Sequence, residues 1–167
     1  MTIPDMIAAP ETFTADGRFE LEAAQAAIRR ECGWHITPPL RLEGAVNSRG
    51  GRLVQLPCMH ITNVESITDR DGRPLEYELD TDSGLLEITG TPPKGVNAIR
   101  YRLTAGYDNA PDVLSVLIAV AKRAKAAGNG YITSQSVNGS SVSYNTATLF
   151  AQEQARLRPY KIIGRTT

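Results

Sequence analysis

The stretch AIRYRLTAGYDNAPDVLSVLIAV, residues 98–120, changes its hydrophobic period halfway and decides the fold class of the chain. In its first half apolar and polar residues alternate, so that Ile99, Tyr101 and Leu103 share one face, as in a strand with one buried and one wet face. From Pro111 onward almost every position is apolar, which indicates a helix surrounded by protein. The sequence therefore predicts that a β-sheet leads directly into a buried helix.

Strand-like runs precede this stretch, and helical runs flank them. Between about residues 40 and 104, short β-type runs are separated by the turn sequences NSRGG, DRDGRP, DTDSG and TPPKG. Helices are predicted over residues 18–34, about 110–127 and 146–158. Because the strands form one block and do not alternate with helices, we expect an α+β fold: a small helical bundle of about three helices with an inserted antiparallel β-block of five to six strands.

A chain of 167 residues is expected to form a single domain. The expected organisation is an irregular N-terminal segment (1–17), a single helical core domain (18–127 plus 145–158) with a β insertion at about 40–104, an assembly loop or strand (128–144) and a C-terminal tail (159–167).

The charge balance excludes some classes of protein. Lys plus Arg and Asp plus Glu both number 18, so the formal net charge is zero, which argues against a protein that grips nucleic acid by bulk charge. A neutral chain also does not repel copies of itself. No apolar run approaches the roughly 18 residues that cross a bilayer, and MTIPDMIAAPETF lacks the pattern of a signal peptide. With two cysteines, the chain is expected to fold in a reducing cytoplasm without a membrane partner.

Every Cys and His of the chain enters one candidate metal site. Cys32 and His35 lie three residues apart at a predicted helix end, and Cys58 and His60 lie two apart on a predicted strand. Two Cys with two His can close a tetrahedral zinc site. The spacings are not those of zinc fingers, and both cysteines also fit buried core positions. We therefore expect no metal and no cofactor, and keep a small metal-binding or ligand-binding α+β domain as the alternative function.

Catalytic patterns are absent from the sequence. Ser140 and Ser141 lack the second glycine of a G-x-S-x-G elbow and any histidine tied to them, so a hydrolase is the weakest hypothesis. The DTDSG run with Asp80 and Asp82 lacks the glutamate of a calcium loop and favours a hairpin turn. There is no P-loop, no G-x-G-x-x-G and no H-E-x-x-H. We expect no catalytic residue and no enzyme.

The polar segment VNGSSVSYNT, residues 137–146, has the alternation of a short exposed strand. Such a segment can add to the sheet edge of a neighbouring subunit by main-chain hydrogen bonds. The predicted subunit contact comprises Ser140, Ser141, Val142, Ser143 and Tyr144.

Five stretches carry a resemblance to a known family: EAAQAAIRRECGWHITP (22–38), LPCMHITNVESITDRDGRPL (56–75), IRYRLTAGYDNAPDVLSVLIAVAKRA (99–124), VNGSSVSYNT (137–146) and LRPYKI (157–162). In order and texture they resemble the head-to-tail connector (adaptor) proteins of long-tailed bacteriophages, especially the actinobacterial-phage type with a β insertion. The GY…P passage from strand to helix is among the most telling parts.

This resemblance implies a structural virion protein. Family members form a ring under the portal, usually of matching twelvefold symmetry, and carry the DNA channel on to a stopper or tail protein. The implied partners are copies of the same chain, the portal protein, a stopper or tail-completion protein, and double-stranded DNA that passes through without sequence readout. The implied location is the head-tail junction of the virion, after synthesis in the host cytoplasm. The resemblance also assigns a portal contact to Tyr160, Lys161, Ile162 and Ile163.

Features of the sequence itself fit such an assembly. The helix over residues 113–121 needs apolar neighbours, and the last predicted helix carries too little apolar surface to hold itself down. Head-to-tail contacts around a ring would supply partners for both.

Overall fold

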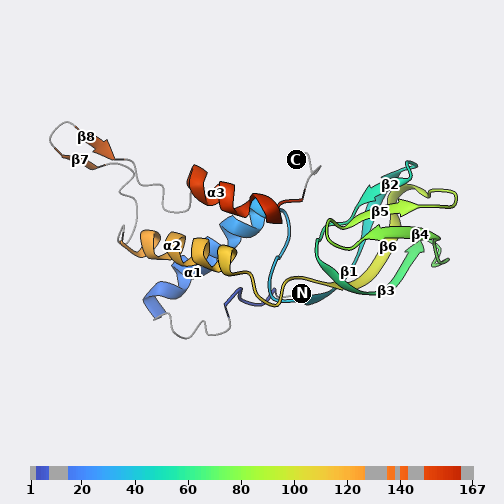
Figure 1. Cartoon of the computed structure of the whole chain (residues 1–167), viewed down its shortest axis with the longest axis horizontal. Coiled ribbons are helices and arrows are strands. Elements are labelled where there is room, and N and C mark those ends of the chain that lie inside the picture. The colour runs from blue at the N-terminus through green and yellow to red at the C-terminus, as the bar shows by residue number, and fades with distance from the viewer. Residues whose placement is uncertain (1–2, 8–14, 127–134, 138–139, 143–148, 163–167) are drawn as a thin grey trace. The chain divides into compact units, whose positions relative to one another are not determined.

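The computed structural model describes residues 3–7, 15–126, 135–137, 140–142 and 149–162 (Figure 1). Its helices are α1 (Ala15–Cys32), α2 (Pro111–Ala126) and α3 (Ala151–Leu157), and a 3₁₀ turn follows at Arg158–Tyr160. Its strands are β1 (Leu40–Arg49), β2 (Leu53–Gln55), β3 (Ile61–Asp69), β4 (Tyr77–Asp80), β5 (Leu85–Ile88), β6 (Lys94–Ala105), β7 (Gln135–Val137) and β8 (Ser140–Val142). Six antiparallel strands thus lie in sequence between α1 and α2, which confirms the predicted α+β class.

The chain divides into two compact units. The helical unit, Met1–Cys32 with Ala110–Pro159, holds the described helices and the β7–β8 hairpin. The β unit, Gly33–Asn109 with Tyr160–Thr167, holds β1 to β6. The expectation of one helical domain with a β insertion stays a prediction. Among the described residues no helix combines the length and the hydropathy that spanning a membrane requires.

In the helical unit, α1 and α2 pack against each other through apolar stripes. Apolar residues recur in the sequence of α1 at steps of three and four, which predicts a buried stripe. The structure confirms this stripe, because Leu21, Ala24, Ile28 and Cys32 are all buried. On α2 the buried side chains are Val113, Val116, Leu117, Val120, Ala121 and Ala124. The prediction that protein surrounds α2 is wrong within the single chain, because α1 and α3 cover only one side and Ile118 stays 38% exposed.

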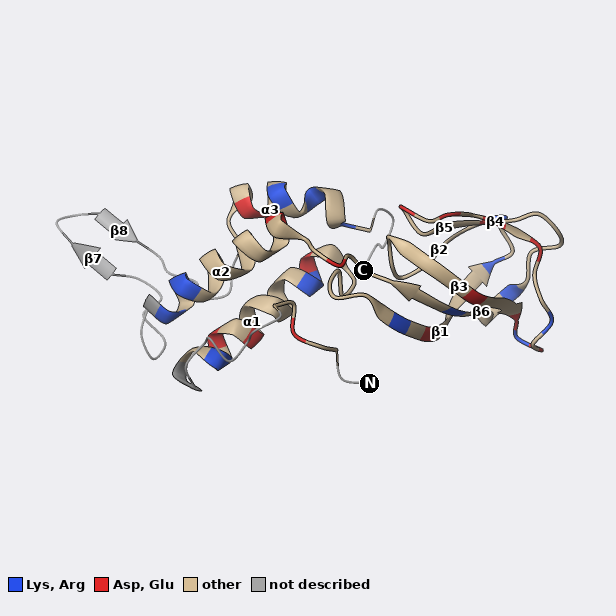
Figure 2. Ribbon diagram, turned by 60° about the horizontal axis from the view of Figure 1, so that its bottom comes forward, with Lys and Arg blue, Asp and Glu red and all other residues tan. Residues whose placement is uncertain are grey.

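The β unit consists of two three-stranded antiparallel sheets, in the orders β1–β6–β3 and β2–β5–β4. The sheets lie as two layers, one above the other in Figure 2. The alternation predicted for β6 is confirmed, since Ile99 and Leu103 are fully buried whereas Arg100 is exposed. The core residues include Val54, Leu86 and Ile88 from one sheet and Ile67, Ile99 and Leu103 from the other.

Gly106 ends β6 at a close backbone approach. Its φ of +127° is a conformation that side-chain-bearing residues rarely adopt. A Cβ built there would lie 2.8 Å from His35 Nε2, 2.8 Å from the Pro38 carbonyl oxygen and 2.9 Å from Pro39 Cα. His35 itself lies 2.9 Å, through Nε2, from the Ala105 carbonyl oxygen. A glycine is thus required at position 106 both by the backbone conformation and by the nearby atoms of His35, Pro38 and Pro39.

We expect the substitution Gly106→Ala to lower the free energy of unfolding of the β unit by about 3 kcal/mol, since it adds left-handed strain and overpacking against backbone atoms. Urea titration followed by the fluorescence of Trp34, the single tryptophan of the chain, measures this unit. The matched control is Gly72→Ala, where φ is +87° and nothing lies within 4 Å of the new Cβ, so only the strain of about 1 kcal/mol remains. Equal losses for the two variants would show that the close approach is not a constraint.

Candidate assembly surfaces

An aromatic cluster in the β unit holds Tyr160, the last residue of the 3₁₀ turn. Tyr107 lies at its centre, stacked on His60 at 4.2 Å between ring centroids and edge-on to Tyr160 at 5.3 Å. Trp34 tilts toward Tyr107 at 6.1 Å and donates a 2.7 Å hydrogen bond from Nε1 to the carbonyl oxygen of Tyr160. Burial raises the pKa of Tyr107, and the neighbouring Tyr160 and Asp82 act in the same direction. The hydrogen bond from Trp34 to Tyr160 joins residues 126 positions apart in the sequence.

The residues predicted for portal contact begin at this cluster. Tyr160 is half-buried in the cluster, Lys161 is exposed, and Ile162 is buried at 5% exposure. Tyr160 and Ile162 therefore serve within the chain as anchors for the tail. Ile163 lies outside the described residues. The portal contact of these four residues stays a prediction.

The serine-rich segment predicted for subunit contact begins as a strand. Ser140, Ser141 and Val142 form β8, which pairs antiparallel with β7 through Val137↔Ser140, Ser136↔Ser141 and Gln135↔Val142. The predicted strand is thus confirmed over these three residues, and Ser143 and Tyr144 lie outside the described residues. Since no third described strand joins the β7–β8 ladder, its outer main-chain edges are not paired within the described chain. Addition to a neighbouring subunit stays a prediction.

The two cysteines are core residues. Cys32 is buried on α1, with its Sγ 3.9 Å from the Leu157 carbonyl oxygen, and Cys58 is fully buried in the β unit. Burial raises the pKa of the Cys58 thiol to about 12.

The two histidines are likewise engaged in the fold. His35 is buried beside the Ala105 carbonyl, and His60 stacks on Tyr107 with Nδ1 3.9 Å from the Asp82 carboxylate. The part of the chain that the structure describes contains no group of three or more His, Cys, Asp or Glu able to hold a metal ion. Nothing in the structure therefore supports the metal-binding alternative.

A partly buried ion pair attaches α3 to α2. Arg123 donates to both carboxylate oxygens of Glu153 at 2.7 and 2.9 Å, and its guanidinium carbon lies 3.9 Å from the centroid of the Phe150 ring. Burial opposes ionisation of Glu153, but the Arg123 pair and the N–H of Phe150 outweigh it, so the pKa of this carboxyl is lowered. Sequence reasoning missed this contact because nothing local links two residues 30 positions apart. The apolar part of the attachment is small, comprising Leu149 and Leu157.

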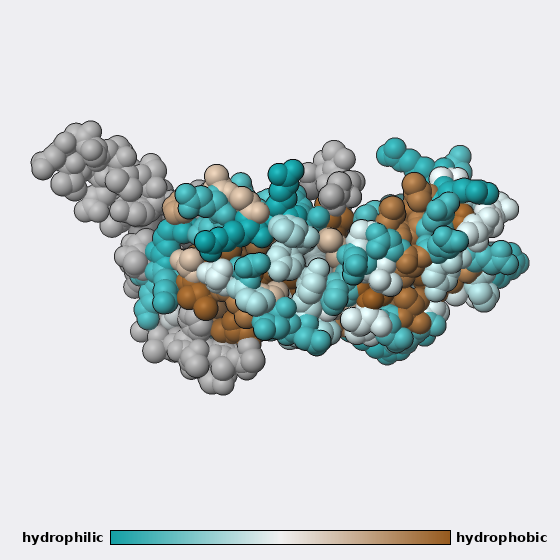
Figure 3. All heavy atoms as spheres, viewed as in Figure 1, coloured by the Kyte–Doolittle hydropathy of each residue, from teal (hydrophilic) through white to brown (hydrophobic). Residues whose placement is uncertain are grey.

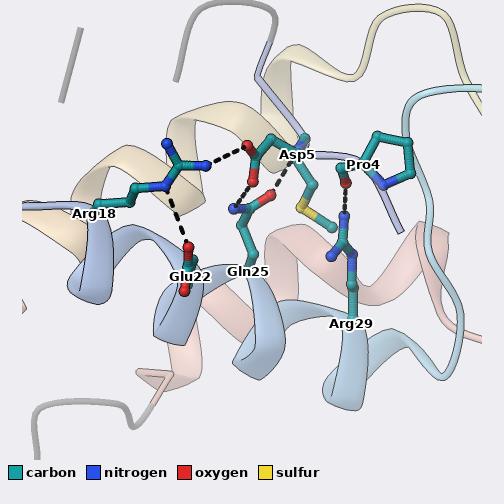
Figure 4. Close-up of polar contacts among 7 residues, drawn as sticks. Pro4, Asp5, Arg18, Glu22, Gln25 and Arg29 are labelled. Atoms are coloured by element: carbon teal, nitrogen blue, oxygen red, sulfur yellow. Dashed lines mark hydrogen bonds and ion pairs between the residues drawn. The ribbon is translucent and has the colours of Figure 1, made fainter. Parts of the chain in front are cut away.

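An N-terminal strap, residues 3–7, lies along α1 (Figure 4). Gln25, which is 2% exposed, accepts a 2.6 Å hydrogen bond from the Met6 N–H and donates one of 2.9 Å to Asp5. The Pro4 carbonyl accepts a hydrogen bond from Arg29, and the Met6 side chain is buried. A buried glutamine on the apolar stripe of α1 is thus explained by the strap that it binds.

The outer face of the β1–β6–β3 sheet carries matched charges. Arg41 binds Glu65 through two hydrogen bonds of 2.6 and 2.7 Å, and Arg102 binds Glu43 through two of 3.0 and 3.2 Å. A groove of about 590 Å³ lies beside them, and Arg100 is among its lining residues. Glu43 and Arg102 line this groove as well.

Comparison with known proteins places the fold. No family model and no curated protein matches the chain. Among solved structures, a chain in "Neck of native GTA particle computed with C12 symmetry" has a TM-score of 0.63 at 15% identity, with 98% of this chain and 93% of that chain covered. A chain in "Neck of empty GTA particle computed with C6 symmetry" has a TM-score of 0.55 at 17% identity, over 98% and 93% of the two chains. A further similarity, to "Virion of native gene transfer agent (GTA) particle", has a TM-score of 0.49 at 17% identity over 98% and 96%. The chain thus shares its fold with chains of those two neck structures across nearly its whole length.

The ion pair between Arg123 and Glu153 predicts a pH-dependent attachment of α3. Because the pKa of Glu153 is lowered in the folded protein, its stabilising effect is present above the ordinary value of 4.5 and is lost as pH falls through the lowered one. Glu153→Gln should lower the free energy of unfolding of the helical unit by about 1–2 kcal/mol at pH 7 and abolish that acid dependence. Hydrogen exchange of the α3 amides measures both effects.

The matched control for this variant is Glu22→Gln. Its partner Arg18 lies on the exposed surface of α1, with both side chains more than half exposed, so the change should cost less than about 0.5 kcal/mol. If the two variants changed the exchange rates of α3 equally, the Arg123–Glu153 pair would not be what attaches this helix.

Proposed function

We propose that this chain is a structural subunit of the neck of a phage-like particle, where copies of it form a ring between the portal and the stopper or tail. In this role it is a head-to-tail connector, or adaptor, that continues the DNA channel. The observation that carries the proposal is the shared fold with two neck structures, which extends over the helical unit and the β unit together. The sequence resemblance to connector proteins supports the same role independently.

The exposed apolar side chains of the helical unit support assembly with further chains. Phe19 on α1 is 77% exposed, Phe150 before α3 is 54% exposed, and Ile118 on α2 is 38% exposed. Apolar side chains gather on parts of the surface, shown brown in Figure 3. Single exposed apolar residues are ordinary in monomers. Here they add to the helix pair α1 and α2, which carries more apolar residues than the chain itself buries.

The formal charge supports a structural contact with DNA and argues against a sequence-reading one. The chain has a net charge of zero, and two arginines on the outer face of the β1–β6–β3 sheet, Arg41 and Arg102, are already bound by carboxylates, which leaves Arg100 as the groove-lining arginine without such a partner among the described residues. Double-stranded DNA would therefore pass through the ring without base recognition. The proposed partners are other copies of this chain, the portal protein and a stopper or tail-completion protein, all within the virion. This role needs neither a cofactor nor an active site.

The domain organisation takes a specific form in this proposal. The helical unit and the β unit together act as one ring subunit, with the segment 128–144 and the C-terminal tail as its reaching parts. The aromatic cluster would fix the point from which the tail leaves toward the portal, because Trp34 and Tyr107 hold Tyr160. The β7–β8 hairpin would offer its open main-chain edge to an adjacent copy.

Mass photometry and negative-stain imaging of the purified chain, alone and mixed with the portal of the same particle, test this function. We expect closed rings on the portal, with one copy of the chain for each portal subunit. A portal ring from an unrelated phage serves as the control and should bind no chain. A chain that stays monomeric in both mixtures, over micromolar concentrations and at low salt, contradicts the proposal.

A further inference from the structure

The outer face of the β2–β5–β4 sheet is an apolar hollow with an acidic rim. Alternation along the strands turns Val54, Leu86 and Ile88 into the core and leaves Leu53 and Leu85 outside, at 61% and 37% exposure. The hollow has a volume of about 310 Å³ and is lined by Leu53, Glu78, Leu79, Asp80, Leu85 and Glu87. Exposed leucines in a hollow are a feature of surfaces that bind another molecule.

Two carboxylates on this face oppose each other without a cation between them. Glu78 on β4 and Glu87 on β5 are direct cross-strand partners, and both are exposed. Neither has an ion pair or hydrogen bond through its side chain among the described residues, and the three strands contain no Lys or Arg. Like charges at directly opposite positions destabilise a sheet. The isolated sheet therefore carries a local conflict, of a kind that proteins retain at functional sites.

The β1–β6–β3 sheet of the same unit has the opposite imbalance, a surplus of positive charge. On its outer face Arg41 and Arg102 are neutralised by Glu65 and Glu43, whereas Arg100 on the central strand β6 is exposed and has no such partner among the described residues. Arg100 lines the groove of about 590 Å³, and its direct cross-strand neighbours are Ala45 and Thr68, which are uncharged. Strands β1, β3 and β6 together hold five Lys or Arg and three Asp or Glu. Strands β2, β4 and β5 hold no Lys or Arg and three Asp or Glu.

We propose that the outer face of the β2–β5–β4 sheet of one copy docks onto the outer face of the β1–β6–β3 sheet of a second copy. In this contact Glu78 and Glu87 pair with Arg100, and Leu53 enters the groove beside it. Charge complementarity selects a second copy as the occupant, because the same chain provides both the unmatched carboxylates and the unmatched guanidinium. The inference rests on the ring assembly of the proposed function.

The placement of the two faces determines the kind of assembly. The sheets are the two layers of one β unit, so their outer faces point away from each other (Figure 2). A contact between unlike faces is heterologous, and repeated around an axis it closes into a ring when the rotation allows. The proposed contact therefore produces a ring in which each copy presents its β2–β5–β4 sheet to the β1–β6–β3 sheet of the next copy, in the same sense all the way around the axis.

Charge reversal on each face, alone and together, tests this contact. Glu87→Arg should weaken self-association by at least about tenfold, and Arg100→Glu should do the same, because each places like charges across the interface. The double variant Glu87→Arg/Arg100→Glu exchanges the two signs, so it should regain most of the affinity of the natural chain. Sedimentation velocity on the full chain, at low and high salt, measures the association, and rescue by the double variant is the expected result.

Arg73→Glu is the matched control, since it makes the same charge change on a side chain 79% exposed in a turn and should leave association unchanged. Circular dichroism and Trp34 fluorescence show whether each variant is folded, and the double variant keeps the test decisive if a single one fails to fold. If the natural chain forms rings and both single variants form them equally well, the inference is overturned while the proposed function stays intact. Single variants that still form rings but no longer bind the portal also overturn it, because these faces would then serve a different partner. Absence of rings for the natural chain with its portal contradicts the proposed function itself.

Discussion

Strand β6 is the constraint on which the β unit depends, because it pairs with β1 on one side and β3 on the other and supplies the large, fully buried side chains of Ile99 and Leu103. Burial of each such side chain contributes about 1.5–3 kcal/mol. The same alternation places Arg100 and Arg102 on the outer face. The charged surface of this sheet is therefore a direct consequence of its buried face. A register shift of one residue would exchange core and surface, which makes the pairing strongly specified. Gly106 then ends the strand where a side chain would collide with the loop that carries His35.

Polar contacts between distant parts of the sequence complete each unit. In the β unit the indole of Trp34 holds the backbone of Tyr160, and in the helical unit Arg123 holds Glu153 and thereby α3. Gln25 does the same for the N-terminal strap. Each of these groups is at least partly buried, so loss of one partner leaves a desolvated polar atom and costs more than the hydrogen bond itself contributes. Tyr160, α3 and the strap at residues 3–7 are thereby each held by a contact distant in sequence.

Sequence patterns predicted the α+β class, the apolar stripe of α1 and the inward face of β6, because helix and strand periodicities are local and strong there. The division into two separate sheets was not predictable, since strand pairing joins residues that no local pattern connects. The candidate zinc site, kept only as an alternative, grouped Cys and His by spacing alone. In the fold His35 and His60 instead contact neighbouring groups, and Cys58 lies in the core. Ser140 and Ser141 lie in β8, and no local pattern in the sequence indicated that this strand pairs with β7. The unmatched Glu78–Glu87 pair was invisible in the sequence, because only the register places these carboxylates opposite each other.

The proposed ring subunit of a particle neck would join these features, since it would need two unlike surfaces that meet around an axis. The chain shares its fold with chains of two neck structures, and the charge difference between its two sheets supplies a physical basis for such a contact. A cryo-electron microscopy reconstruction of the neck of intact particles that carry this chain tests the central claim most directly. The expected result is a closed ring of copies coaxial with the portal, all pointing the same way around the axis. Density for the chain in the capsid lattice or at the tail tip, or its absence from the particle, would contradict it.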